Sequence, residues 1–298
     1  MKIAYLILAF KLPEQLVRLV RKLSDRDTYF FIHIDKKIKP ELFQHFVQLI
    51  EPNDNVIFIK RHNSDWGRIG CIEAKLEGIN EIKKMGVDFD YLINLSGQDY
   101  PIKSNQQIAD FLQENYGKSF LNYNPIPYRD HPHLDDLINY WHFYFYKYHL
   151  VFPKENMFFS PILSQLWKPI ARRIKVRPKL PLGYKPYYGS SYWCFTRELI
   201  DYVHAFTREN QSFVRWFSHV QFPDEFFFQT MLMNSPYKNE ITDNNLRYID
   251  FSSKKANPKV LTVDDFPKFT GSGKLFARKF DQNVDNAVLD MIDETIEG

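Results

Sequence analysis

Short apolar runs alternate with amphipathic stretches through the first third of the chain. The runs have the length and the β-branched and aromatic content of strands that are buried on both faces. In the stretches between them, apolar residues recur at the three- and four-residue spacing of one helix face. This alternation predicts an α/β fold with a central, mostly parallel, twisted sheet flanked by helices. The expected strands are residues 3–9, 29–34, 55–59 and 90–95, and the expected helices are residues 16–23, 40–51 and 73–85.

One apolar run, at residues 91–95, breaks abruptly into the turn sequence Ser-Gly-Gln-Asp at residues 96–99. Ligands in open α/β sheets bind beyond the carboxyl ends of the strands, and right-handed crossovers place this turn beside Ala9 and Asp35. The turn is therefore a candidate ligand-binding site. The alternative interpretation is an ordinary strand that ends in a glycine-containing turn.

The rest of the chain is less regular. Residues 122–187 are rich in Pro, Tyr, Phe and basic residues and keep no period, which predicts a loop-rich insertion over the cleft. Beyond it, the expected strands are residues 188–196 and 247–251, and the expected helices are residues 197–207, 224–234 and 287–296. Because no repeat or clear linker interrupts the chain, residues 1–298 are predicted to form a single domain. Its predicted parts are residues 1–121, the insertion and residues 188–298.

Composition and charge narrow the classes of partner. The formal net charge of +3 is too weak to indicate a nucleic-acid-binding protein. Cys71 and Cys194 lack the spacing of a zinc site or a disulfide framework, which fits a reducing, cytoplasmic setting. No apolar run approaches the ~20 residues of a membrane span. The protein is therefore expected to be cytoplasmic and at most peripheral to the inner face of a membrane. The basic stretch 168–185 could contact such an anionic surface or form a solvated loop.

Two carboxylates, Asp224 and Glu225, follow Pro223 at the start of an expected helix. The ordinary interpretation is that they complement the positive end of the helix dipole, an effect of ~0.3–1 kcal/mol. The functional interpretation is that one of them faces the cleft and acts as a general base on an acceptor hydroxyl. Neighbouring side chains cannot both point the same way, so only one of the two would be the base.

Two cations, Arg278 and Lys279, lie between aromatic residues after a Gly-Ser-Gly sequence. They form either a basic surface turn or a clamp for a diphosphate, with arginine bidentate and lysine as a point charge. Lys259 could add to the clamp. A metal ion is the other means of holding a diphosphate, but both Asp-x-Asp pairs precede their strands and so lie at the wrong edge of the sheet. No metal site is predicted.

Trp66 and Arg68 follow the third expected strand. They could line the ligand pocket, or the tryptophan could be a buried residue that leads into the next helix. The nine histidines are scattered without a metal-ligand spacing, and His131 and His133 lie in the insertion.

Several of these stretches belong together. They are residues 4–11 (AYLILAFK), 31–37 (FIHIDKK), 65–69 (DWGRI), 90–104 (DYLINLSGQDYPIKS), 223–235 (PDEFFFQTMLMNS), 257–266 (NPKVLTVDDF) and 275–281 (LFARKFD). In this order and spacing they resemble the core-2/I-branching N-acetylglucosaminyltransferase and peptide O-xylosyltransferase family. The resemblance spans nearly the whole chain and is weakest between residues 124 and 185. It implies a GT-A-type fold whose nucleotide-binding half is residues 1–121 and whose acceptor and catalytic half is residues 188–298.

The resemblance also implies an inverting glycosyltransferase that uses a UDP-sugar donor, with no metal ion or other cofactor. By motif, Glu225 takes the place of the catalytic base, and Arg278 and Lys279 fall where the family binds the diphosphate. The remaining donor-side matches are Asp35 near the uracil, Ser96, Gly97 and Asp99 near the donor sugar, and Lys259 as a further phosphate-binding cation.

One departure from the family pattern concerns the sugar. Xylosyltransferase-like members tend to carry GGSDW where this chain has GSSYW at residues 189–193. This difference leaves open whether the donated sugar is xylose. It also removes one aspartate that could have been the base instead of Glu225. GlcNAc is the favoured sugar, and xylose, galactose or another sugar is the alternative. The candidate acceptor-side residues are Asp224, Tyr192 and Trp193.

Two other classes of function fit the sequence less well. A nucleotide-dependent dehydrogenase is disfavoured because no GxGxxG follows the first strand. A non-catalytic carbohydrate-binding module would explain the aromatic content of 17% but not Glu225 beside a cationic clamp. The short chain without an anchor or disulfides resembles bacterial members of the family. The expected acceptor is therefore a glycan or lipid-linked oligosaccharide in surface polysaccharide assembly.

Overall fold

The computed structural model describes residues 1–50, 54–127, 133–145, 148–152, 165–166, 179–253 and 257–297. Its largest element is a seven-stranded sheet with the strand order β12-β6-β11-β4-β1-β2-β3. The strands of this sheet are β1 (Ile3–Ala9), β2 (Thr28–Ile34), β3 (Val56–Phe58), β4 (Tyr91–Ser96), β6 (Ser119–Leu121), β11 (Trp193–Thr196) and β12 (Ile241–Thr242).

Four adjacent strands, β4, β1, β2 and β3, run parallel to one another. β11 is antiparallel to both of its neighbours, β4 and β6, whereas β12 is parallel to β6. The α/β fold with a mostly parallel central sheet, predicted from the alternating pattern, is therefore confirmed.

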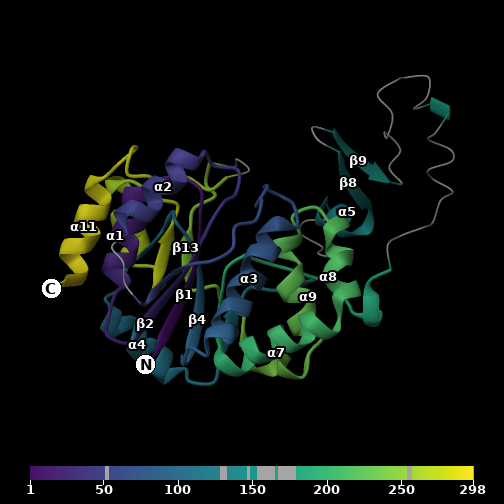
Figure 1. Cartoon of the computed structure of the whole chain (residues 1–298), viewed down its shortest axis with the longest axis horizontal. Coiled ribbons are helices and arrows are strands. Elements are labelled where there is room, and N and C mark those ends of the chain that lie inside the picture. The colour runs from purple at the N-terminus through teal and green to yellow at the C-terminus, as the bar shows by residue number, and fades with distance from the viewer. Residues whose placement is uncertain are drawn as a thin grey trace.

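Helices lie on both faces of this sheet (Figure 1). The helices of one face are α1 (Pro13–Leu23), α2 (Pro40–Leu49), α4 (Asn105–Glu114) and α11 (Ala287–Glu297), which share one apolar core. The helices of the other face are α3 (Gly70–Met85), α7 (Arg197–Glu209), α8 (Gln211–Trp216) and α9 (Phe227–Met233), which share a second core. β1 contributes to both cores, because alternate side chains of a strand point to opposite faces. Tyr5 and Ile7 pack in the first core, and Ala4 and Leu6 in the second.

Short strands form three smaller sheets. The three-stranded sheet consists of β13 (Arg247–Ile249), β14 (Phe276–Arg278) and β5 (Asp99–Pro101), in the order β13-β14-β5. The two-stranded sheets pair β7 (Asn124–Pro125) with β10 (Tyr187–Tyr188), and β8 (Trp141–Phe145) with β9 (Tyr148–Phe152). The remaining helices are α5 (His133–Asn139), α10 (Phe266–Thr270) and the 3-10 turns Pro181–Gly183, Phe217–His219, Pro223–Glu225, Pro236–Glu240 and Val263–Asp265.

Two expected elements differ from the structure. The strand expected at residues 188–196 is divided into β10 and β11, because the backbone between them bonds to the turn that carries Glu225. The helix expected at residues 224–234 begins instead as a 3-10 turn, and α9 starts only at Phe227. Phe226, with φ at −123°, lies outside helical geometry and separates the two.

The other expected strands and helices agree with the observed bounds to within a few residues. The insertion expected at residues 122–187 and the basic stretch 168–185 lie partly outside the described residues. His131 lies outside them. The division of the chain into one domain with two halves stays a prediction.

Candidate active site

The carboxyl ends of β1, β2 and β4 meet at one edge of the sheet. The backbone NH of Asp35 donates to the Ala9 carbonyl (2.9 Å), and the NH of Gly97 donates to the Leu8 carbonyl (3.0 Å). A Cβ at position 97 would lie 3.0 Å from the Ala9 Cβ, so the turn after β4 has little room for a larger residue. The structure thus brings together the strand ends that the sequence placed at one edge.

Asp99 is fully buried in this turn, and its carboxylate makes hydrogen bonds and ion pairs within the protein. Ser96 donates to it through both the hydroxyl (2.8 Å) and the backbone NH (3.1 Å). Arg247 Nε and Arg278 Nη1 each lie 3.4 Å from one of its oxygens. Asp99 therefore fixes two guanidinium groups at the edge of the sheet.

The ring of Tyr192 lies against both of these guanidinium groups. The ring centroid is 4.3 Å from Arg278 Cζ and 4.9 Å from Arg247 Cζ, a distance at which the ring quadrupole attracts a cation. Burial lowers the pKa of both arginines, and the charge of Asp99 opposes this effect. Nε and Nη1 of Arg278 have no hydrogen-bond partner among the described residues. Both atoms are buried, and Nη1 lies within ion-pair distance of the Asp99 carboxylate, so the guanidinium is held inside the protein at the edge of the sheet.

Lys279 extends the positive charge beyond Arg278. Burial and the nearby charges of Lys11 and Arg278 lower the pKa of the Lys279 ammonium. Lys11, which follows β1, pairs with Asp281 at 2.6 Å. Positive charge thus gathers at the end of β14.

Two other predicted donor-side residues make contacts within the protein. Lys259 Nζ lies 2.6 Å from the carboxylate of Asp265, so its charge is already paired. Asp35 accepts a hydrogen bond from the Lys37 backbone NH at 2.9 Å. Its carboxylate lies at the end of β2, at the edge where β1 and β4 also end.

Trp66 and Arg68 lie in the loop before α3, beside the Pro223–Glu225 turn. The Trp66 ring meets Phe222 edge-on at 4.6 Å between centroids, yet 70% of Trp66 is exposed. Phe222 also donates its NH to the backbone of this loop (3.1 Å). Arg68 Cζ lies 4.6 Å from the ring centroid of Tyr144. The alternative in which Trp66 is a buried residue is therefore wrong.

The backbone of Glu225 is held from two sides. Its NH donates to the Phe222 carbonyl (3.0 Å), and its carbonyl accepts from the Gly189 NH (2.8 Å). A Cβ at position 189 would lie 1.9 Å from the Asn122 carbonyl oxygen. Only glycine allows the chain to pass here, and this close passage fixes the turn that carries Glu225.

The carboxyl group of Glu225 binds its proton unusually tightly. Burial and the adjacent Asp224 raise its pKa to about 8, whereas a hydrogen bond with Tyr188 and the charge of Lys75 oppose the rise. A carboxyl group that titrates near neutral pH is suited to general acid–base chemistry.

Lys75 of α3, which the sequence analysis missed, lies next to this carboxylate pair. It is 2% exposed, and its ammonium donates to the Ser191 carbonyl (2.6 Å) and hydroxyl (2.7 Å). The Ser191 hydroxyl donates in turn to Asp224 (2.6 Å). The sequence did contain a signal, because Lys75 falls on the apolar face of α3, three residues after Ile72 and four before Ile79.

Residues 188–192, which we call the bridging segment, connect the two parts of the site. Tyr188 and Gly189 of this segment contact Glu225, and Ser191 contacts Asp224. The last, Tyr192, lies against Arg278. Five consecutive residues thus join a proton-binding carboxyl group to a buried cationic group.

Comparison with known proteins identifies the family of the chain. Residues 3–269 match the family model described as Core-2/I-Branching enzyme. The chain belongs to this family. The resemblance inferred from the seven motifs is confirmed, and with it the enzyme class of the family, the glycosyltransferases.

The chain is similar to proteins named as xylosyltransferases. It is 26% identical to "Xylosyltransferase 2" of Rattus norvegicus over an alignment of 315 positions, which covers 98% of this chain and 33% of that protein. It is 25% identical to "Xylosyltransferase oxt" of Drosophila melanogaster over an alignment of 320 positions, which covers 100% of this chain and 34% of that protein. The chain spans about a third of the length of these curated relatives.

Among solved structures, the chain resembles the 4-diphosphocytidyl-2C-methyl-D-erythritol synthase of Anaerococcus prevotii. The TM-score is 0.32 with 10% sequence identity, over 71% of this chain and 75% of that chain. A TM-score of this size is too low to define a common fold, and the fold is defined by the order and direction of its strands.

The acceptor-side role predicted for Trp193 does not fit the structure. Trp193 is fully buried, stacks on Phe195 at 4.3 Å between centroids and packs against Phe228. It belongs to the second core of the fold, because β11 turns this side chain inward.

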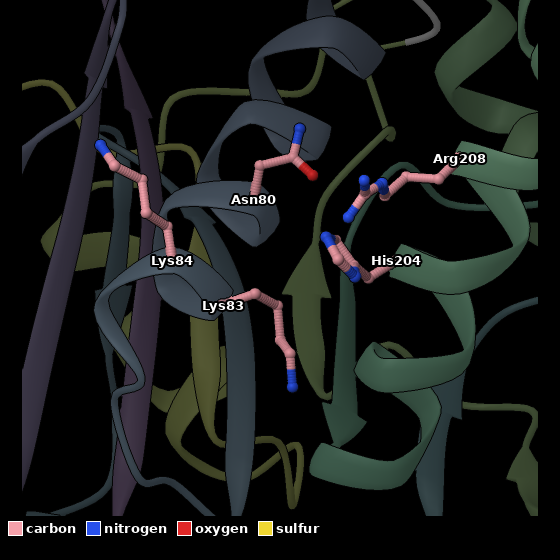
Figure 2. A pocket seen from close by; sticks show the side chains of 5 residues that line it. All are labelled: Asn80, Lys83, Lys84, His204 and Arg208. Carbon is pink, nitrogen blue, oxygen red and sulfur yellow. The ribbon is translucent and has the colours of Figure 1, made fainter.

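A separate pocket of about 500 Å³ opens between α3 and α7 (Figure 2). It is lined by Asn80, Lys83, Lys84, His204 and Arg208. Lys83 pairs with Asp201 (2.7 Å), and Lys84 pairs with Glu81 (3.1 Å). The pocket adjoins the carboxyl-terminal end of α3, which leads to the amino end of β4, so it lies away from the candidate site.

Among the described residues, no group of three or more His, Cys, Asp or Glu side chains could hold a metal ion. Over the same part of the chain, no helix is both long and apolar enough to cross a membrane. Cys71 and Cys194 are free thiols.

Proposed function

We propose that this protein is an inverting glycosyltransferase that moves a sugar from a UDP-sugar to a hydroxyl group of a glycan acceptor. The observation that carries the proposal is the bridging segment. It joins Glu225, whose pKa is raised to about 8, to Arg278, whose guanidinium is held by Asp99 and by the ring of Tyr192. Transfer from a nucleotide sugar needs both groups, one for the incoming hydroxyl and one for the departing diphosphate.

In the proposed reaction, Glu225 takes the proton of the acceptor hydroxyl as its oxygen attacks the anomeric carbon. The new bond forms on the face opposite UDP, while the bond from the anomeric carbon to the phosphate oxygen breaks. The electron pair of that bond stays with UDP, where Arg278 and Lys279 stabilise the added charge. General base assistance of this kind contributes about 10²–10⁴-fold.

The proposed donor site lies at the carboxyl edge of the sheet. Asp99 and Arg247 hold Arg278 and Tyr192 in place at this edge. The residues proposed to face the donor are Asp35, Trp66, Arg68, Ser96, Gly97, Arg278 and Lys279, with the paired Lys259 beside them. Asp224 and Tyr192 are proposed to face the acceptor side.

Replacing Glu225 with glutamine tests the proposal directly. Glutamine keeps the shape of the side chain but cannot accept the proton, so transfer should fall by at least about 100-fold. Binding of UDP, measured by calorimetry, should stay unchanged because the cationic side of the site is intact. Glu209→Gln, at the exposed end of α7, is the matched control. Substantial transfer by Glu225→Gln would refute the assignment of the base.

We also propose that the cations replace a metal ion in neutralising the diphosphate. Treatment with a chelator should therefore leave the transfer rate within about twofold of the untreated enzyme. A clear requirement for Mn²⁺ or Mg²⁺ would contradict this part of the proposal.

The donated sugar is proposed to be GlcNAc, with xylose, galactose or another sugar as alternatives. The relatives named xylosyltransferases favour xylose, whereas the GSSYW sequence at residues 189–193 departs from the xylosyltransferase pattern. The acceptor is proposed to be a glycan or lipid-linked oligosaccharide in bacterial surface polysaccharide assembly, at the cytoplasmic face of the membrane. Hydrolysis of a panel of UDP-sugars by the purified protein would identify the donor.

A further inference from the structure

Lys75 is a charged residue in a place where no ligand reaches it. Its side chain lies on the buried face of α3 and is 2% exposed. A buried ammonium is strongly disfavoured unless its donors are paired. Both hydrogen bonds of Lys75 go to Ser191, at 2.6 Å and 2.7 Å, so the lysine is tied to the bridging segment and not to solvent.

The direction of the hydrogen bonds beyond Lys75 follows from its chemistry. An ammonium group only donates, so the Ser191 hydroxyl accepts from Lys75 and its own proton points to Asp224, 2.6 Å away. The Asp224 carboxylate is thereby held toward Ser191. Glu225, the next residue, faces a different set of groups, and the two carboxylates are kept apart.

The charges around Glu225 come from three elements. Asp224 lies on the same 3-10 turn, Tyr188 on the bridging segment and Lys75 on α3. Of these, only Lys75 carries a positive charge, and it acts against both burial and Asp224. Burial lowers the pKa of the Lys75 ammonium itself. Of the groups that face it, Asp224, Cys71 and Glu225 oppose this effect and Arg247 adds to it.

We propose that Lys75 is a positioning residue for the transfer reaction: through Ser191 its ammonium fixes Asp224 and sets the proton affinity of the Asp224–Glu225 pair. The proposal rests on the function proposed above and deepens it. It explains why Glu225 and not Asp224 is the base. Asp224 is hydrogen-bonded to Ser191, which Lys75 holds in place, so Asp224 is unavailable to the acceptor hydroxyl.

The experiment is a ¹³C-carboxyl NMR titration of the full chain labelled at Glu and Asp, with the Glu225 signal assigned by its loss in Glu225→Gln. Lys75→Met should raise the higher of the two pKa values of the pair by about one pH unit or more, since an opposite charge nearby is removed. Lys83→Met, on the same helix, is the matched control and should leave the titration unchanged. A lower melting temperature for Lys75→Met without a change in either pKa would overturn the proposal.

A double variant keeps the test decisive if Lys75→Met does not fold. Lys75→Met combined with Asp224→Asn removes one charge of each sign, so Glu225 should titrate close to its wild-type pKa. A pKa for Glu225 about one pH unit above the wild-type value in this variant would overturn the proposal.

The titration needs neither donor nor acceptor, so its outcome is independent of the proposed function. If the pKa values move as expected but no UDP-sugar is used, the electrostatic role of Lys75 stands and the transferase proposal fails. If transfer depends on Glu225 but the pKa values ignore Lys75, the transferase proposal stands and the role of Lys75 fails.

Discussion

The proton on Glu225 controls what the site can do at a given pH. Because burial and Asp224 raise the pKa of this carboxyl group to about 8, it is mostly protonated below neutral pH and ionised in alkaline solution. A general base acts only in its ionised form. Activity should therefore increase as the pH rises through the titration of Glu225.

We expect kcat/KM for transfer to rise about tenfold per pH unit below the pKa of Glu225 and to level off above it. The turning point should lie near pH 8 in the free enzyme. Tyr188→Phe removes a hydrogen bond that lowers the pKa, so it should move the turning point to higher pH. A pH–rate profile without a rise across the neutral range would contradict the role of Glu225.

The residues of the site differ in how far the sequence could reveal them. Glu225, Arg278 and Lys279 were predicted because each lies in a compact motif with its neighbours. Lys75 and Arg247 were missed because their partners are distant along the chain. Lys75 bonds to a residue 116 positions away, and Arg247 to one 148 positions away. Only the folded chain brings such partners together.

At the scale of elements, the long apolar strands were predictable, whereas two of the short strands, β5 and β14, were not. β1 and β4 are runs of buried apolar residues, so their sequence alone predicts them. β5 and β14 have three residues each, too few for a period to be visible. The break of the expected strand 188–196 had a signal in its glycine, but the reason for the break, the passage beside Asn122, is tertiary.

Gly189→Ala should disrupt the bridging segment. Its Cβ would lie 1.9 Å from a backbone oxygen that no rotamer change can move. We expect a loss of about 2–4 kcal/mol in the free energy of unfolding and a fall in transfer of about 100-fold, since small displacements of catalytic groups are costly. Urea denaturation and a transfer assay measure the two effects.

The control for this variant is Gly271→Ala, where the nearest neighbour of the new Cβ is the Pro267 carbonyl oxygen at 3.1 Å. This contact requires a shift of only a few tenths of an ångström, so both properties should stay close to wild type. Equal effects of the two substitutions would show that the close passage at Gly189 has no special importance.

At the scale of the whole molecule, α11 ties the end of the chain to its beginning. Val288, Leu289 and Ile292 are buried in the core that α1 also lines. Asp293 accepts hydrogen bonds from Arg18 Nε (2.9 Å) and from the Tyr100 hydroxyl (2.8 Å). The last helix thereby covers one face of the sheet beneath the donor site.

Asp293→Ala should destabilise the fold by about 1–3 kcal/mol, because partly buried donors lose their acceptor. For a chain of this size each kcal/mol lowers the melting temperature by about 2–4 °C. Asp290→Ala is the matched control, since Asp290 pairs with the same Arg18 but its side chain is 53% exposed. Its effect should stay below about 1 kcal/mol. Similar losses for both variants would refute the role of Asp293.

The pairing of β5 with β14 has a consequence for synthesis of the chain. The Gln98 side chain donates to the carbonyl of Phe280, 182 residues later, a stretch that takes about 10–40 s to translate. During this interval the parallel sheet can form, but β14 and the cations Arg278 and Lys279 have not yet been made. β5 therefore remains a free strand edge in the nascent chain. Pro101, which ends β5 and has no NH to offer, limits the chance that another chain pairs there first.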